Sequence, residues 1–407
     1  MAIDQIDLRS CPSPQTLKDM AQERTGLEDF GDPGRDKGLD ALVRSMNAET
    51  WQDMSGEARE LAVDYLVHQL STRLKLMADR KAYPQIAQEQ VTAPLIVVGA
   101  PRTGSTVMHT LISLDPDNLS PEQWLCLEPS PPLALGPPTQ QRRELAEQRM
   151  SKLFAPVPDI LITHPYMIDE GAGALAECGS DILSMAFTAQ QLWCFWGGDI
   201  YRRYLLEADH SAAVEFYHDF LQHCQWGANG SRWTLKGAEH MIWLTELAEQ
   251  FPDAKFIWTH RDLSQQLASV ASVTAVLLGL RGHPVTPEAR RAQGREAIEF
   301  QRENYEKGVR ARDAIGDDRF IDVSYHAMIA DPFETVERIY DACGLTFSDK
   351  HAANIAKWRE EHPQNKHGAH KHSPEEFGME ADDINRRFAS YVDRFGFGFG
   401  IRPDVMA

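Results

Sequence analysis

The sequence predicts an α/β fold in which helices flank a parallel sheet. A short apolar, β-branched run at 95–98 and a second strand-like segment at 255–260 are each followed by helical patterning. Strands separated by helices of about 10–15 residues typically pair in parallel, with both faces covered. The 407 residues, 43% hydrophobic and 25% charged, are enough to bury the core of such a sheet.

Residues 1–90 predict a helical region ahead of the sheet. Ser13 and Pro14 form a cap and first-turn pair, and the helix that they open should end near Gly26. From Ser55, apolar residues recur at the i, i+3, i+4, i+7 spacing of a single helical stripe. This region contains no candidate catalytic or binding residues.

The remainder, 91–407, is predicted to be one α/β domain that contains a helical, aromatic-rich insertion at 139–230 and a basic loop with a C-terminal helix at 362–407. Further strands are expected at 232–236 and 320–325. The aromatic residues of the insertion either pack in a core or line an apolar pocket for a ligand.

The stretch from Leu95 onward predicts a buried strand, a tight loop and the start of a helix at Ser105. Backbone amides of such a loop, with the helix dipole, bind anions such as phosphate. The segment from Gly99 to Gly104 matches G-x-x-x-x-G, which indicates a P-loop-type sheet, although a chance glycine pair would look the same. Ser105 stands where ordinary nucleotide-binding loops have lysine, and the cation is Arg102 instead, which disfavours an ATP-dependent kinase.

Two more cations end predicted strands. Lys236 closes the strand at 232–236, and Arg261 directly follows the strand at 255–260. Ligands of parallel sheets bind beyond the carboxyl ends of the strands. We therefore expect Lys236, Arg261 and the loop around Arg102 to lie in one crevice.

Composition disfavours several other classes of protein. The net charge of −19 disfavours nucleic-acid binding, which needs a basic face. Six cysteines without a C-x-x-C pair indicate neither a zinc site nor a disulfide framework, and no metal site is predicted.

The basic tract that includes Lys366, His367, Gly368 and His370 is either a solvated loop or a flap over an anionic ligand. The sequence also shows no signal pattern and no apolar run of about 20 residues, so we predict a cytoplasmic protein without a transmembrane segment.

An ordered set of motifs resembles the sulfotransferases that use 3′-phosphoadenosine 5′-phosphosulfate (PAPS), most closely a bacterial branch with an N-terminal helical region. The resemblance covers nearly the whole chain. Besides PRTGST at 101–106, the motifs are RTGLEDFG (24–31), LISLDPDN (111–118), AEC (176–178), WTLKGAEH (233–240), FPDAKFIWTHRD (251–262), ADPFETVERIY (330–340) and HSPEEFGM (372–379).

The resemblance implies two anion sites for PAPS and for its product, 3′-phosphoadenosine 5′-phosphate. The loop residues would hold the 5′-phosphosulfate, and a strand-end arginine with a serine eight positions on, here Arg261 and Ser269, would hold the 3′-phosphate. Lys236 and the basic tract would add cations. The loop residues concerned are Arg102, Thr103, Gly104, Ser105 and Thr106.

Sulfuryl transfer to a hydroxyl also needs a base. Glu122, twenty residues after Arg102 and close to Trp124, is the preferred candidate. Relatives place an acid directly after this tryptophan, where this chain has Leu125. The alternatives are Glu128, His164 and Glu177.

The resemblance thus implies a PAPS-dependent sulfotransferase acting on a small, apolar or aromatic hydroxyl acceptor. The alternative is a non-catalytic nucleotide-binding or interaction protein that retains the fold. Transfer of sulfate from PAPS distinguishes the two.

Overall fold

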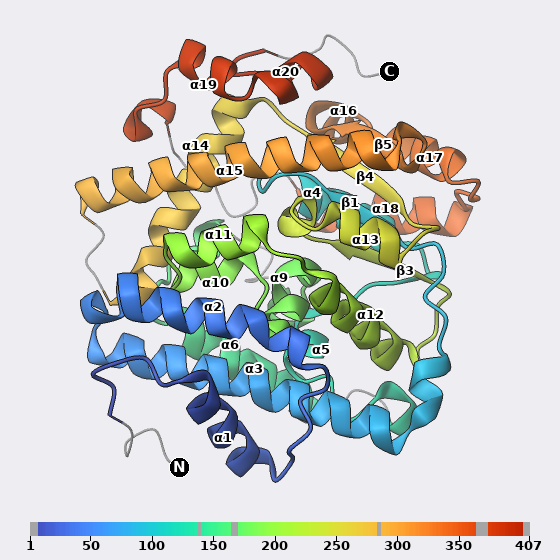
Figure 1. Ribbon diagram of the computed structural model, residues 1–407. Coiled ribbons are helices and arrows are strands. Elements are labelled where there is room, and N and C mark those ends of the chain that lie inside the picture. The colour runs from blue at the N-terminus through green and yellow to red at the C-terminus, as the bar shows by residue number, and fades with distance from the viewer. Residues whose placement is uncertain (1–6, 137–139, 164–169, 283–285, 364–372, 402–407) are drawn as a thin grey trace. The chain divides into compact units, whose positions relative to one another are not determined.

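The computed structural model describes residues 7–136, 140–163, 170–282, 286–363 and 373–401 (Figure 1). The chain forms two compact units. Unit 1 comprises Met1–Gln90, Pro121–Ala228 and Val276–Val285, and unit 2 comprises Val91–Ser120, Asn229–Ala275 and Thr286–Ala407.

Unit 2 contains a five-stranded parallel sheet, which confirms the predicted α/β class. The strand order is β2-β3-β1-β4-β5, and the strands are β1 (Leu95–Val98), β2 (Asn118–Leu119), β3 (Arg232–Lys236), β4 (Lys255–His260) and β5 (Phe320–Ser324). Val97 lies opposite Lys236 on one side and Ile257 on the other. This register brings the carboxyl ends of β3 and β4 level with the loop that follows β1.

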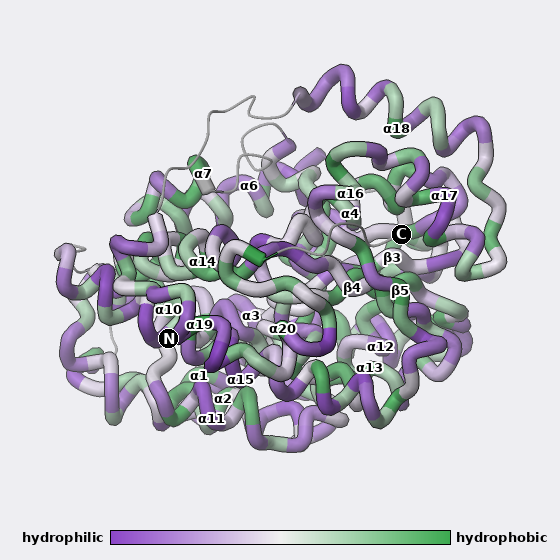
Figure 2. Tube along the Cα trace, turned by 90° about the horizontal axis from the view of Figure 1, so that it is seen from above, coloured by the Kyte–Doolittle hydropathy of each residue, from purple (hydrophilic) through white to green (hydrophobic). Residues whose placement is uncertain are grey.

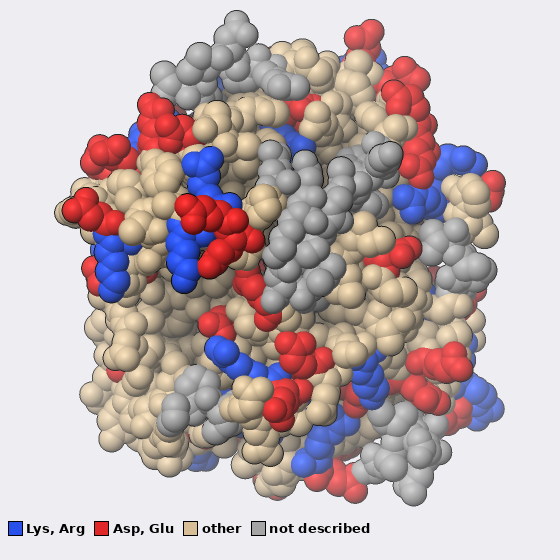
Figure 3. Space-filling view, turned by 180° about the vertical axis from the view of Figure 1, so that it is seen from behind, with Lys and Arg blue, Asp and Glu red and all other residues tan. Residues whose placement is uncertain are grey.

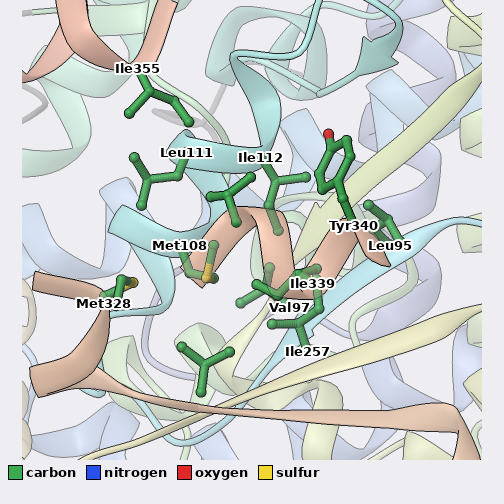
Figure 4. Packing of buried hydrophobic residues seen from close by; sticks show 12 residues of the cluster. Leu95, Val97, Met108, Leu111, Ile112, Ile257, Met328, Ile339, Tyr340 and Ile355 are labelled. Carbon is green, nitrogen blue, oxygen red and sulfur yellow. The ribbon is translucent and has the colours of Figure 1, made fainter. Parts of the chain in front are cut away.

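One face of the sheet packs against α4 (Ser105–Ser113), α17 (Pro332–Ala342) and α18 (Asp349–Glu361). Figure 4 shows apolar side chains of these helices, Met108, Leu111, Ile112, Ile339 and Ile355, with Val97 of β1 and Ile257 of β4. Each such side chain contributes about 1.5–3 kcal/mol by leaving water. Figure 2 shows hydrophobic and hydrophilic segments alternating along α18, as expected for a helix with one buried side.

The opposite face is covered by other helices of unit 2. Trp258 follows Ile257 in β4, so its side chain points to the opposite face of the sheet. There its ring contacts that of Phe395 of α20 (Ala389–Phe395), with ring centroids 5.4 Å apart. The long helix α15 (Pro287–Ile315) packs against α20 and α13 (Leu244–Gln250) (Figure 1). The single C-terminal helix predicted within 362–407 is instead two, α19 (Ala381–Arg387) and α20, because the backbone leaves the helical region at Phe388.

Unit 1 is helical in its described residues. Ser13 caps α1 (Pro14–Thr25), Gly26 ends it at φ 69°, and Ser55 caps α3 (Gly56–Ala82), as the sequence predicts. The other α-helices are α2 (Lys37–Ser45), α5 (Gln123–Leu127), α6 (Gln140–Phe154), α7 (Ile160–Thr163), α9 (Cys178–Leu183), α10 (Gln190–Phe195), α11 (Asp199–Glu207) and α12 (Ser211–Gln225).

One stretch that includes α14 (Leu263–Leu277) differs from the expectation of no membrane-length segment. Leu263–Arg281 is long and apolar enough to cross a membrane by length and composition alone. Because 67% of its most apolar window is buried, it has the character of a core helix, which passes the same test.

Candidate functional site

The loop between β1 and α4 is shaped by two glycines with positive φ. Gly99 has φ 129°, and a Cβ atom there would lie 2.7 Å from the carbonyl oxygen of Thr259. Gly104 has φ 92°, and a Cβ atom there would lie 2.6 Å from the ring of Tyr325. Only glycine fits both positions without strain.

Arg102 also has a left-handed backbone, at φ 72°, which is unfavourable for a residue with a side chain. Residues held in such conformations cluster at ligand-binding sites. Gly104 then serves as the N-cap of α4 without a side-chain hydrogen bond to the helix amides. The first turn of α4 therefore presents amides that have no partner within the helix, as anion-binding loops do.

The loop hydroxyls differ in their surroundings. Thr103 is fully buried, donates to the Ala100 carbonyl at 2.7 Å and lies 2.7 Å from the Thr259 hydroxyl. Its side chain therefore fixes the loop to β4. Thr106 lies on the first turn of α4 and accepts a hydrogen bond from Lys236 Nζ at 3.1 Å, while Ser105 is buried beside it.

The predicted cations converge at the carboxyl ends of the strands, as expected. Arg102 Nε donates to Ser269 Oγ at 3.0 Å, and Arg261 Nη1 donates to the Arg102 carbonyl oxygen at 3.2 Å. With Lys236 on Thr106, the loop, the ends of β3 and β4, and Ser269 of α14 meet at one site within unit 2.

Arg261 is held from two sides. Its guanidinium lies 4.3 Å from the centre of the Tyr325 ring, and Nη2 donates to Gln265 Oε1 at 2.6 Å. Its buried Nε has no hydrogen-bond acceptor in the part of the chain that the structure describes. The sequence did not single out Tyr325, although it ends the strand predicted at 320–325, directly after the observed end of β5.

Burial controls the charges near the loop. It lowers the pKa of Lys236 to about 7; Glu239 partly offsets this shift and Arg102 adds to it. Burial likewise lowers the pKa of His109 and of His240 to about 3, and Lys236 adds to both shifts. Both histidines are therefore neutral at physiological pH.

The candidate bases that the structure describes belong to unit 1. Glu122 accepts hydrogen bonds at Oε2 from Trp124 Nε1, at 2.5 Å, and from Arg143 Nη2, at 2.9 Å. Glu128 is 8% exposed and accepts from Arg149 Nε at 2.6 Å. Each carboxylate is thus paired with an arginine.

The segments that carry Glu122 and Glu177 lie side by side. Glu122 forms an antiparallel bridge with Leu175, and the Gln123 amide donates to the Ala174 carbonyl at 2.8 Å. Glu177 follows directly as the N-cap residue of α9. No pattern in the sequence signalled this pairing.

Other predicted site residues lie outside the described residues: His164, Lys366, His367, Gly368 and His370. Across the described ranges, no group of three or more His, Cys, Asp and Glu side chains is placed to hold a metal ion.

Comparisons with known proteins agree with this architecture. Residues 94–349 match the model of a family described as the sulfotransferase family. The crystal structure of sulfotransferase STF9 from Mycobacterium avium is similar, with 28% identity, coverage of 99% of this chain and 100% of that chain, and a TM-score of 0.83. That of sulfotransferase STF1 from Mycobacterium tuberculosis H37Rv shares 25% identity over 94% of this chain and 99% of its own, with a TM-score of 0.76.

A curated relative extends the comparison. Omega-hydroxy-beta-dihydromenaquinone-9 sulfotransferase Stf3 from Mycobacterium bovis is 24% identical over 310 residues, which is 75% of each chain. The family match alone spans more than half of the present sequence. The chain therefore belongs to the sulfotransferase family.

Proposed function

We propose that this protein transfers a sulfuryl group from PAPS to the hydroxyl of a small apolar or aromatic acceptor. The observation that carries the proposal is the junction of Arg102, Arg261 and Ser269, in which the loop after β1 contacts the end of β4 and α14. PAPS carries two separate anionic groups, and the junction offers a cation and hydrogen-bond donors for each.

The residues present fit such a donor. The amides at the start of α4, Arg102 and Lys236 suit the phosphosulfate, because each brings positive charge to the same loop. Arg261 and Ser269 suit the 3′-phosphate. The buried Nε of Arg261, which has no acceptor among the described residues, supports this assignment because a bound phosphate would supply one.

The proposed reaction needs positioning and charge stabilisation more than covalent chemistry. The acceptor oxygen forms a bond to sulfur while the bond from sulfur to the phosphate oxygen breaks, and the hydroxyl proton passes to a base. Negative charge grows on the departing phosphate, where Arg102, Lys236 and the helix amides stabilise it.

Glu122 is the base that we propose. Its pairing with Trp124 and Arg143 holds the carboxylate in one orientation, with Oε2 as the shared acceptor. Glu128 is held by Arg149, and Glu177 lies on the segment adjacent to Glu122. Glu122→Gln, Glu128→Gln, Glu177→Gln and His164→Gln, compared at saturating PAPS, identify the base as the variant with a kcat loss of roughly 10²-fold or more.

The proposed acceptor class is supported by the aromatic-rich composition of the insertion at 139–230 and by one relative. The name of the Mycobacterium bovis relative gives it a hydroxylated menaquinone as acceptor, which is an apolar alcohol. Nucleic acid is not a proposed partner, because the net charge is −19 and the Lys and Arg side chains on the face shown in Figure 3 lie among Asp and Glu. We place the protein in the cytoplasm.

The test combines binding with turnover. The protein should transfer radiolabelled sulfate from PAPS to a panel of apolar alcohols and phenols, and Arg102→Ala should abolish transfer while the protein stays folded. Binding of 3′-phosphoadenosine 5′-phosphate with no transfer to any acceptor would favour the non-catalytic alternative. Absence of both would refute the proposal.

A further inference from the structure

Lys236 occupies an unusual position for a lysine. It ends β3, its exposed fraction is 1%, and its Nζ lies 3.1 Å from the hydroxyl of Thr106 on the first turn of α4. An ammonium ion there is removed from water and faces the positive end of a helix.

The titratable groups that face Lys236 are mostly cationic or neutral. Arg102 approaches from the loop, His109 from α4, and His240 and Glu239 from the turn Ala238–Met241 that follows β3. Glu239 is the acid that raises the pKa of Lys236 among the described residues, and it is itself 2% exposed. Burial, Arg102 and the helix terminus disfavour a charged lysine, whereas Glu239 favours one.

We infer that Lys236 takes up a proton when the anionic donor binds, so that it becomes a full cation only while the donor is in place. This inference rests on the proposed function. A phosphosulfate beside Nζ reverses the local field, and the bound state then favours the ammonium form. Since burial lowers the pKa of Lys236 to about 7 in the free protein, much of the lysine is neutral above that pH and able to accept a proton.

The coupling between donor binding and proton uptake determines how the affinity for the donor depends on pH. Where the complex holds one more proton than the free protein, affinity falls as pH rises, by up to about tenfold per pH unit. The arrangement also removes the cost of a buried ammonium next to Arg102 in the free protein. The positive charge of Lys236 is then present while the donor is bound, when it can stabilise the phosphate that becomes the leaving group.

Calorimetry measures the proton directly. The protein is titrated with 3′-phosphoadenosine 5′-phosphate at a pH of about 8 in two buffers of different ionisation heat, HEPES and Tris. The difference between the two binding heats should correspond to uptake of up to about one proton. Lys236→Arg keeps a cation that does not deprotonate. It should bind the nucleotide without this uptake, and the difference between the two proteins cancels any proton taken up by the ligand itself.

Lys255→Arg is the matched control. Lys255 begins the adjacent strand β4, at the end of the sheet away from the loop, and donates to the Asp318 carbonyl at 2.8 Å. Its proton uptake should equal that of the parent protein.

Equal uptake by the parent and Lys236→Arg would overturn the inference, since Lys236 would then be charged throughout. If Lys236→Arg does not fold, the pH profile of the parent decides: affinity should weaken above pH of about 7, and a flat profile to about pH 9 overturns the inference. Failure of the parent to bind the nucleotide at all would instead refute the proposed function.

Discussion

Gly104 shows how a single residue determines the shape of the loop. Its φ of 92° and the ring of Tyr325, 2.6 Å from a Cβ atom, both exclude a side chain. Gly104→Ala should destabilise unit 2 by about 1–3 kcal/mol and weaken binding of 3′-phosphoadenosine 5′-phosphate, because the loop must shift. Urea unfolding and calorimetry measure the two effects.

Gly344→Ala isolates the backbone contribution in that experiment. Gly344 has φ 66° but no atom within 4 Å of its added Cβ atom. It should lose stability without losing nucleotide affinity. Equal losses of affinity in both variants would show that the contact with Tyr325 does not shape the loop.

Arg261 provides the second prediction for a single residue. Arg261→Ala should weaken binding of 3′-phosphoadenosine 5′-phosphate by about 1.5–3 kcal/mol, roughly 10- to 150-fold, since a charge-assisted contact to phosphate is lost. Binding of AMP, which has no 3′-phosphate, should change little. Calorimetry with both ligands makes the comparison, and a parallel loss for AMP would place Arg261 outside the 3′-phosphate site.

At the level of elements, helix caps provide a local test of stability. Asp331 caps α17 by accepting hydrogen bonds from the amides of Phe333 and Glu334, each at 3.0 Å. Asp331→Ala should cost about 1 kcal/mol and lower Tm, whereas Asp331→Asn should keep most of the stability because asparagine caps equally well. A similar loss in both variants would mean that the amide hydrogen bonds are not the source of the stability.

The same caps explain which elements could be predicted from the sequence. Ser13, Ser55 and Asp331 each precede a helix, β1 is a continuous apolar run and β4 has an apolar centre, Phe256–Trp258, so local chemistry suffices. Helix α15 was missed because its buried side includes Gly294, Gln301, Asn304 and Gly308, whose polarity or small size hides the apolar period. The strand β2 has two residues and is defined only by its pairing with β3.

Parts of the candidate site could also be predicted from the sequence, and parts could not. The cations were predictable because each sits at the end of a strand, and the carboxyl ends of parallel strands share one edge. The surroundings of the acids were not, since the Glu122 segment pairs with residues 174–176 through long-range backbone hydrogen bonds. No local pattern encodes such a pairing.

At the scale of the whole molecule, buried histidines predict how stability depends on pH. Burial lowers the pKa of His68, His109 and His240 from 6.5 to about 3. Between these values the unfolded chain binds more protons than the folded protein, so the free energy of unfolding falls as pH drops below about 6.5. At a pH of about 5 each histidine should remove roughly 2 kcal/mol.

Urea unfolding at several pH values tests this dependence. His109→Asn should unfold with a shallower pH slope than the parent protein, because it removes a buried group whose pKa is lowered on folding. An unchanged slope in His109→Asn would show that this histidine does not contribute.

The contacts that shape the loop after β1 also determine when it can form during synthesis. Thr103 rests on Thr259, which lies 156 positions later, and Gly104 rests on Tyr325, farther still along the chain. A growing polypeptide on the ribosome therefore holds the loop sequence long before it holds the residues that shape it. Because such distant contacts form late, nucleotide capture should begin only after β5 has emerged from the exit tunnel. A stalled chain that ends before β5 would have the PRTGST motif but no functional phosphate cradle.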